Sequence, residues 1–153
     1  MRSWSAFWVL PVLLIACGSA DDLKLTARTS DEALEITDNP FGSAVSGRFR
    51  LELVLGSEVS GSTEVTAGTF ELQTEAGELL ADLGQASPEP TFPVSLNKGE
   101  TKAVVFTIEN IDVDRAKACP GPVRIVGSVM DSSKGGTVPV RSAAITPDCG
   151  ENP

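Results

Sequence analysis

One polar segment of this sequence carries side chains of the kind that bind a hard metal ion. Glu109–Asp114 reads ENIDVD, and in an extended segment Asn110, Asp112 and Asp114 would lie on one side. Calcium takes oxygen ligands, but about six to eight of them, and the spacing of an EF-hand loop is absent. A solvated loop in an acidic protein explains the same residues. The sequence therefore predicts no metal and no other cofactor, and these three residues are the candidates for the alternative, a calcium site.

Catalytic side chains are scarce along the chain. The sequence contains no histidine, which excludes Ser-His-Asp and Cys-His catalysis and histidine-based zinc sites. It also contains no G-x-S-x-G motif and no glycine-rich phosphate-binding motif. Lys98, Glu100 and Lys102 surround Gly99, and we interpret them as a charged turn beside a strand. We predict no catalytic residue. A hydrolase that uses carboxylates stays an alternative, because two catalytic carboxylates can lie far apart in the sequence and come together only in the fold.

Two cysteines, Cys119 and Cys149, are placed to form a disulfide. The segments Pro122–Met130 and Gly135–Ile145 flank a glycine-rich turn and predict a β-hairpin. The midpoint of the two cysteines falls inside that turn, so they should face each other across the open end of the hairpin. A crosslink closing about 30 residues stabilises by ~3.5 kcal/mol in the chain-entropy model. Free thiols or a redox pair are the alternatives, but the Cys-x-x-Cys spacing of redox motifs is absent.

The beginning of the chain has the composition of an export signal. Arg2 is followed by an apolar run from Phe7 to Ala16, about ten residues, whereas a membrane span takes roughly 20. Export would deliver Cys119 and Cys149 to a compartment in which disulfides persist.

The end of this apolar run resembles the lipobox of bacterial lipoproteins. Leu14-Ile15-Ala16-Cys17 has the aliphatic residue, the tolerant position, the small residue and the cysteine of that motif. The resemblance implies that residues 1–16 are a signal peptide, that Cys17 is lipidated, and that 17–22 form a short tether. Gly18 after the cysteine then favours the outer membrane. The alternative is ordinary secretion with cleavage after Ala20, which would discard Cys17.

The charge of the chain limits its partners. It carries 12 Lys and Arg against 21 Asp and Glu, a net charge of −9, and removal of Arg2 with the signal leaves 11 − 21 = −10. Such a surface repels nucleic acid and anionic lipid headgroups. We therefore expect no nucleic acid partner, and contact with a membrane only through the lipid anchor.

Hydrophobic residues after the signal alternate with a period of two. RFRLELVL, Arg48–Leu55, places its apolar residues on one face, and TKAVVFTIEN, Thr101–Asn110, does the same. Turn residues separate such runs at short intervals, which predicts an all-β, antiparallel β-sandwich of about seven to nine strands over 23–149. Pro139 places the last strand at a sheet edge. DEALEI, Asp31–Ile36, is the one segment that fits a single helical turn, and 150–153 form a tail.

A second resemblance concerns the mature domain. FELQTEAGELLADLG followed by SLNKGETKAVVFTIEN is similar to the Ig-like domains found behind lipoprotein signals in bacteria. The sequence departs from antibody-like domains, since it has no core tryptophan, no tyrosine corner and no cysteine pair expected to link the sheets. The resemblance implies fold and location and assigns no functional residue.

The expected function is that of a membrane-anchored, non-enzymatic envelope lipoprotein. Gly18–Asp22 allow a reach of at most ~18 Å before the first expected strand, so a protein or glycan partner in the same envelope is favoured. The loops 38–46, 57–63 and 84–92 are the expected binding surfaces. The alternatives are a carboxylate-based hydrolase and a ligand or calcium carrier.

Overall fold

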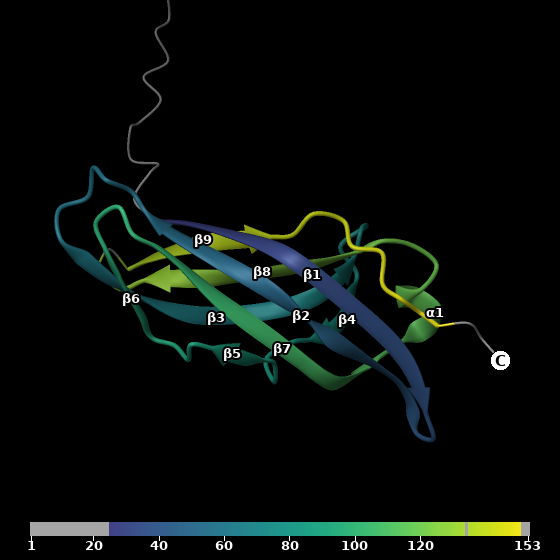
Figure 1. The fold of residues 1–153 in the computed structure, drawn as a ribbon. Coiled ribbons are helices and arrows are strands. Elements are labelled where there is room, and N and C mark those ends of the chain that lie inside the picture. The colour runs from purple at the N-terminus through teal and green to yellow at the C-terminus, as the bar shows by residue number, and fades with distance from the viewer. Residues whose placement is uncertain (1–24, 134, 151–153) are drawn as a thin grey trace, which may run out of the picture.

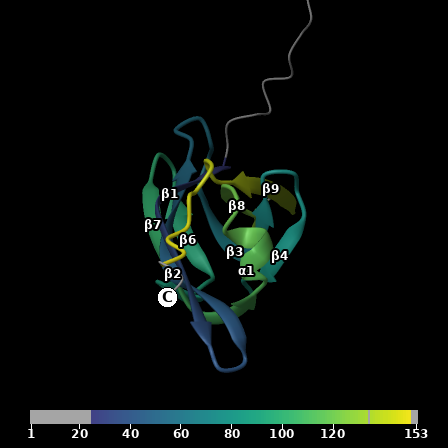
Figure 2. The ribbon, with the colours of Figure 1, turned by 90° about the vertical axis from the view of Figure 1, so that its right-hand side faces the viewer.

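The computed structural model describes residues 25–133 and 135–150. The signal segment, Cys17 and most of the tail lie outside these residues. The described chain forms two antiparallel sheets packed face to face, which confirms the predicted all-β sandwich (Figures 1 and 2). Within the described ranges there are nine strands, and none of the helices is long and apolar enough to cross a membrane.

One sheet has the strand order β1-β2-β7-β5, and we call it sheet A. The other, sheet B, has the order β4-β3-β8-β9, with β6 paired to the beginning of β3. Sheet A contains β1 (Leu25–Asn39), β2 (Gly42–Leu55), β7 (Thr101–Val113) and β5 (Ser87–Glu89). Sheet B contains β3 (Ser62–Thr74), β4 (Leu79–Asp82), β6 (Val94–Asn97), β8 (Val123–Asp131) and β9 (Gly136–Arg141).

The core lies between the sheets and follows the alternation of the sequence. Phe49 of β2 stacks on Phe106 of β7 with ring centroids 4.6 Å apart, and Phe70 of sheet B packs against both rings at 5.6 and 5.0 Å. All three rings are buried. Burying each such side chain contributes about 1.5–3 kcal/mol, so this aromatic cluster is a main link between the sheets. The buried residues of the predicted strand Arg48–Leu55 are Phe49, Leu51, Leu53 and Leu55.

The two longest strands of sheet A pair through an irregular region. The register of β1 and β2 shifts between Ser30 and Ala33, and Asp31 adopts a left-handed backbone with φ of 53°. Gly47 of β2 has φ of +153°, and a Cβ there would lie 2.1 Å from the carbonyl oxygen of Ala33. Only glycine fits this close approach. The β-bulge increases local twist and gives the outer face of sheet A its irregular surface.

The predicted hairpin of β8 and β9 is confirmed. Pro139 lies in β9, the last strand of sheet B, as expected for a residue that cannot donate a ladder hydrogen bond. Asp131 at the turn is buried and accepts hydrogen bonds from Thr63 of β3 and from the backbone and side chain of Ser133. The turn is therefore fastened to the neighbouring strand.

Three local features differ from the expectations. Asp31–Ile36 lies within β1 and does not form a helical turn, because Ala33–Ile36 pair with β2 as an extended strand after the bulge. The one helix in the described residues is α1 (Arg115–Ala118), whose N-cap is Asp114. The expected loop 84–92 contains β5, which pairs with β7 along the sheet edge.

The long hairpin of β1 and β2 gives the sandwich two distinct ends. Leu25, at the start of β1, pairs with Leu55, so the β2–β3 loop lies at the same end as Leu25. Asn39 pairs with Gly42 at the other end, where the hairpin extends past the rest of sheet A (Figure 1). Fourteen steps along β1 at about 3.3 Å each separate the two ends by about 45 Å.

Candidate functional site

The candidates for a calcium site occupy the end of β7 and the cap of α1. Asn110 has φ of 48°, and its backbone N–H donates to the Ser46 hydroxyl at 3.1 Å. Asp114 accepts a hydrogen bond from the backbone N–H of Ala116 at 3.0 Å and so caps α1. Asp112 is exposed beside them. Across 25–133 and 135–150, no three His, Cys, Asp or Glu side chains are grouped so as to hold a metal ion.

The charged residues around Gly99 form a turn, in agreement with their interpretation from the sequence. Glu100 accepts a hydrogen bond from the Asn97 backbone N–H at 2.7 Å and forms an ion pair with Lys102 at 3.3 Å. The Asn97 hydrogen bond, with the help of Lys102, lowers the pKa of Glu100 below its ordinary value. These contacts stabilise the turn between β6 and β7.

The predicted disulfide between Cys119 and Cys149 is present, with the two Cα atoms 6.0 Å apart. The bond joins the C-cap of α1 to the C-terminal segment. That segment also pairs with β1, because the Asp148 N–H donates to the Leu34 carbonyl at 2.8 Å and the Asp148 carbonyl accepts from the Ile36 N–H at 2.7 Å. The disulfide therefore fastens the chain end to α1, next to its pairing with β1.

Arg115 strengthens this attachment. Its guanidinium donates to the carbonyl oxygens of Cys149 and Gly150 and forms an ion pair with Asp38 of β1 at 3.2 Å. Lys117, two residues along α1, forms an ion pair with Glu78 at 2.5 Å, which raises the pKa of Lys117. We call this set of contacts around Arg115 and the disulfide the C-terminal clamp. It supports the long hairpin near its tip.

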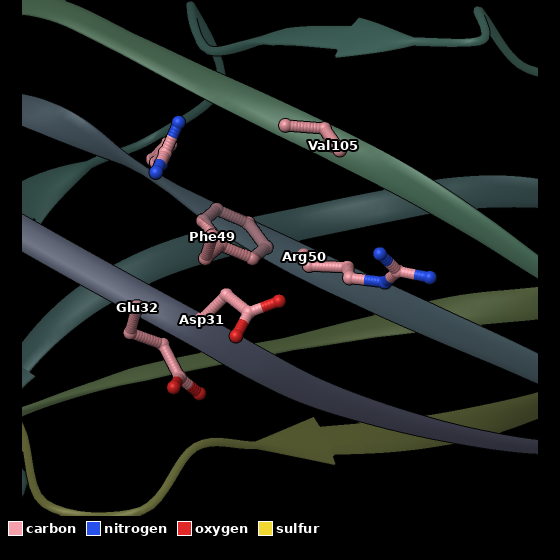
Figure 3. Close-up of a pocket in the computed structure, with 6 residues that line it drawn as sticks. Asp31, Glu32, Phe49, Arg50 and Val105 are labelled. Carbon is pink, nitrogen blue, oxygen red and sulfur yellow. The ribbon is translucent and has the colours of Figure 1, made fainter.

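A charged cavity of about 490 Å³ lies on the outer face of sheet A beside the β1 bulge (Figure 3). Asp31 and Glu32 line it from β1, and Arg48 and Arg50 line it from β2. Arg50 lies 3.6 Å from Glu52, an exposed pair of little energetic value. One carboxylate oxygen of Glu32 is buried and makes no hydrogen bond with the described residues.

The arrangement in this cavity differs from a carboxylate catalytic pair. The side chains of Asp31 and Glu32 point in different directions, and neither forms an ion pair with Arg48 or Arg50 among the described residues (Figure 3). The sequence identified Arg48 and Arg50 only as the polar face of a strand. It gave no signal for Asp31 and Glu32, because the bulge that brings them here depends on the pairing of β1 with β2.

The tip of the β1–β2 hairpin presents the most exposed large apolar side chain among the described residues. Phe41 is 99% exposed. Its backbone N–H donates to the Asn39 side-chain oxygen at 2.8 Å, and the Ser43 hydroxyl donates to Asp38 at 2.6 Å. The proline before it, Pro40, fixes one more backbone angle. The ring therefore projects from an ordered turn.

A shallow cavity of about 460 Å³ lies next to this ring. Residues of the hairpin tip, of β4 and of the end of β7 line it. Leu80 of β4 contributes apolar surface, and Leu79 beside it is 56% exposed. Acidic side chains also line this cavity, and no basic side chain does. We call the lining the hairpin-tip surface, and it consists of Phe41, Gly42, Ser43, Leu80, Asp112, Val113 and Asp114.

The three expected binding loops take different positions. The expected loop 38–46 is mostly strand, because β1 runs to Asn39 and β2 begins at Gly42, so the turn at the hairpin tip is residues 40–41 alone. The loop 57–63 lies at the opposite end near Leu25, and 84–92 runs along the edge of sheet A. The sequence gave no sign that Phe41 would be exposed. Comparison with known proteins adds no relative: no protein-family model matches the chain, and no curated protein matches it.

Proposed function

We propose that this chain is a lipid-anchored, non-enzymatic binding module of a bacterial cell envelope. The likeness of Leu14–Cys17 to a lipobox supports the anchor, and the likeness of the later strands to Ig-like domains of envelope lipoproteins supports the class of module. The disulfide of Cys119 and Cys149 fits an exported protein, because such bonds persist outside the reducing cytosol.

The observation that carries the proposal is the position of Phe41. Leu25 follows Cys17 by eight residues, a span of at most about 28 Å, so the Leu25 end of the sandwich stays near the membrane that holds the lipid. The hairpin tip lies at the other end, about 45 Å along β1. Aromatic side chains are enriched at protein interfaces, so an exposed ring next to further apolar surface supports a role in binding. The anchor and the binding surface thus occupy opposite ends.

In this proposal the acyl chains on Cys17 are the anchor. The residue after the cysteine indicates which membrane holds them. Two or three acyl chains bury many methylene groups at about 0.8 kcal/mol each, which makes attachment stable. Gly18 favours the outer membrane by the sorting pattern of lipoproteins in double-membraned bacteria. Release after cleavage behind Ala20 is the competing outcome.

Metabolic labelling tests the anchor. Cells that produce the full chain are grown with clickable palmitate, and the Cys17→Ala variant is compared with Ser19→Ala, which keeps the cysteine. Label should appear in the native chain and in Ser19→Ala and disappear in Cys17→Ala. An unlabelled native chain whose mature N-terminus is Asp21 would contradict the anchor and favour secretion. A Gly18→Asp variant should stay labelled and shift toward the inner membrane on a density gradient.

A further inference from the structure

Phe41 lies on a surface whose shape and charge specify the kind of partner it fits. We propose that the hairpin-tip surface docks into an apolar pocket of a protein partner, and that lysine or arginine side chains rim this pocket. The inference rests on the proposed function, because it names the surface and the partner of the same binding module. It does not depend on the lipid anchor.

The turn that carries the ring is held in place before any partner arrives. The Asn39 side chain accepts a hydrogen bond from the Phe41 backbone N–H. In the next residue pair of the hairpin, the Ser43 hydroxyl donates a hydrogen bond to Asp38. Asp38 is in turn held by Arg115 of the C-terminal clamp. A turn that is already ordered loses little backbone freedom on binding, so less of the binding energy is spent on ordering it.

The apolar centre of the surface continues from the ring toward sheet B. Leu80 and the largely buried Val113 line the shallow cavity beside Phe41. A single exposed apolar residue is ordinary on a protein surface, whereas an aromatic ring next to further apolar side chains forms a patch. This patch fits an apolar pocket better than a flat polar surface.

The charges around the patch are acidic. Asp112 and Asp114 line the cavity, and none of its lining residues is basic. The nearby cations are occupied, since Arg115 pairs with Asp38 and Lys117 with Glu78. Complementary charge at an interface rim speeds association and excludes wrong partners. A rim of lysine or arginine on the partner meets this requirement.

The same charges argue against three other occupants. A second copy of the chain would bring together two molecules of net charge −9, and the acidic residues of the tip would meet an acidic surface. An anionic membrane repels the tip for the same reason. A neutral glycan would leave the two aspartates without opposite charges, so it gains nothing from the acidic rim.

Site-specific photocrosslinking in intact cells tests the proposal with the full chain. Phe41 is replaced by p-benzoylphenylalanine, which keeps an aromatic side chain at the tip, and the same replacement at Val105, on the outer face of sheet A, serves as the control. Position 41 should give one adduct of defined mass, and position 105 none. Mass spectrometry should place the crosslink in an apolar pocket of a protein, with lysine or arginine around it.

Binding measurements with the purified, identified partner then test the aromatic anchor and the acidic rim separately. Phe41→Ala should weaken binding by roughly 30-fold, as expected for an aromatic anchor, while the melting temperature of the domain stays the same. Asp112→Asn should weaken binding less and make it less dependent on salt, because it removes one rim charge. Ser57→Ala, in the loop at the opposite end, should leave binding unchanged.

Each contrary outcome has a distinct meaning. An adduct at Val105 but not at position 41 would overturn the docking surface and leave the binding module standing. Adducts at neither position, repeated with the photoreactive residue in the loops 57–63 and 84–92, would contradict both proposals. A crosslink from position 41 to a second copy, a lipid or a glycan would overturn the protein partner. A pocket without basic residues would overturn its predicted chemistry.

Discussion

Two phenylalanines eight residues apart show how differently the two regions of this molecule are used. Phe49 is fully buried and stacks on Phe106, while Phe41 projects from the hairpin tip and is 99% exposed. Both belong to the same hairpin, so the difference does not come from local chain propensity. Phe49 stabilises the sandwich, because its ring is part of the core. Phe41 has no such role in stability, and in our proposal it serves binding.

The largest expected effect lies in the core. Phe49→Ala should lower the free energy of unfolding by about 3–5 kcal/mol, because it removes buried apolar area and leaves a cavity between Phe70 and Phe106. Chemical denaturation of the purified domain measures this loss. A loss below about 1 kcal/mol would mean that the aromatic cluster does not link the sheets as described.

The C-terminal clamp should show the next largest effect. Replacing Cys119 and Cys149 together with serine should cost ~3.5 kcal/mol, since the bond closes a loop of 30 residues. The hairpin tip should also lose support, because the chain end carries the carbonyl groups that hold Arg115. Hydrogen exchange would then speed up at Ile36, whose N–H donates to Asp148. Unchanged exchange at Ile36 would show that the clamp does not depend on the disulfide.

The turn between β6 and β7, which contains Glu100, should show a smaller effect on stability that depends on pH. The pKa of Glu100 is lowered from 4.5, so its contribution to stability is present above that value and is lost as pH falls through the folded pKa. Glu100→Gln should therefore lower the melting temperature slightly at neutral pH and leave it nearly unchanged in acid, once the pH lies below the folded pKa. A difference from the native chain that is the same at both pH values would contradict this role.

Sequence alone predicted the parts of the fold that depend on local patterns. The alternation in Arg48–Leu55 located a strand and its buried face, and the position of the β8–β9 turn between Cys119 and Cys149 located the disulfide. Both features follow from spacing along one stretch of chain.

Features that depend on pairing between distant segments were not predictable. The segment Asp31–Ile36 fitted a helical turn, but it continues the single strand β1 through a bulge. The proline-rich segment 84–92 looked like a loop, although β7 offers it an edge to pair with as β5. The exposure of Phe41 depends on its place in the turn beyond Asn39 and Gly42, and that place is set by the register of β1 with β2.

The smallest expected effect on stability belongs to the residue with the largest expected effect on binding. Phe41→Ala should change the free energy of unfolding by no more than about 0.5 kcal/mol, because the ring has almost no contact to lose. The decisive measurement combines thermal unfolding of this variant with the size of its complex in mild detergent extracts of envelopes. The account predicts an unchanged melting temperature and loss of the complex. A lowered melting temperature with the complex intact would contradict it.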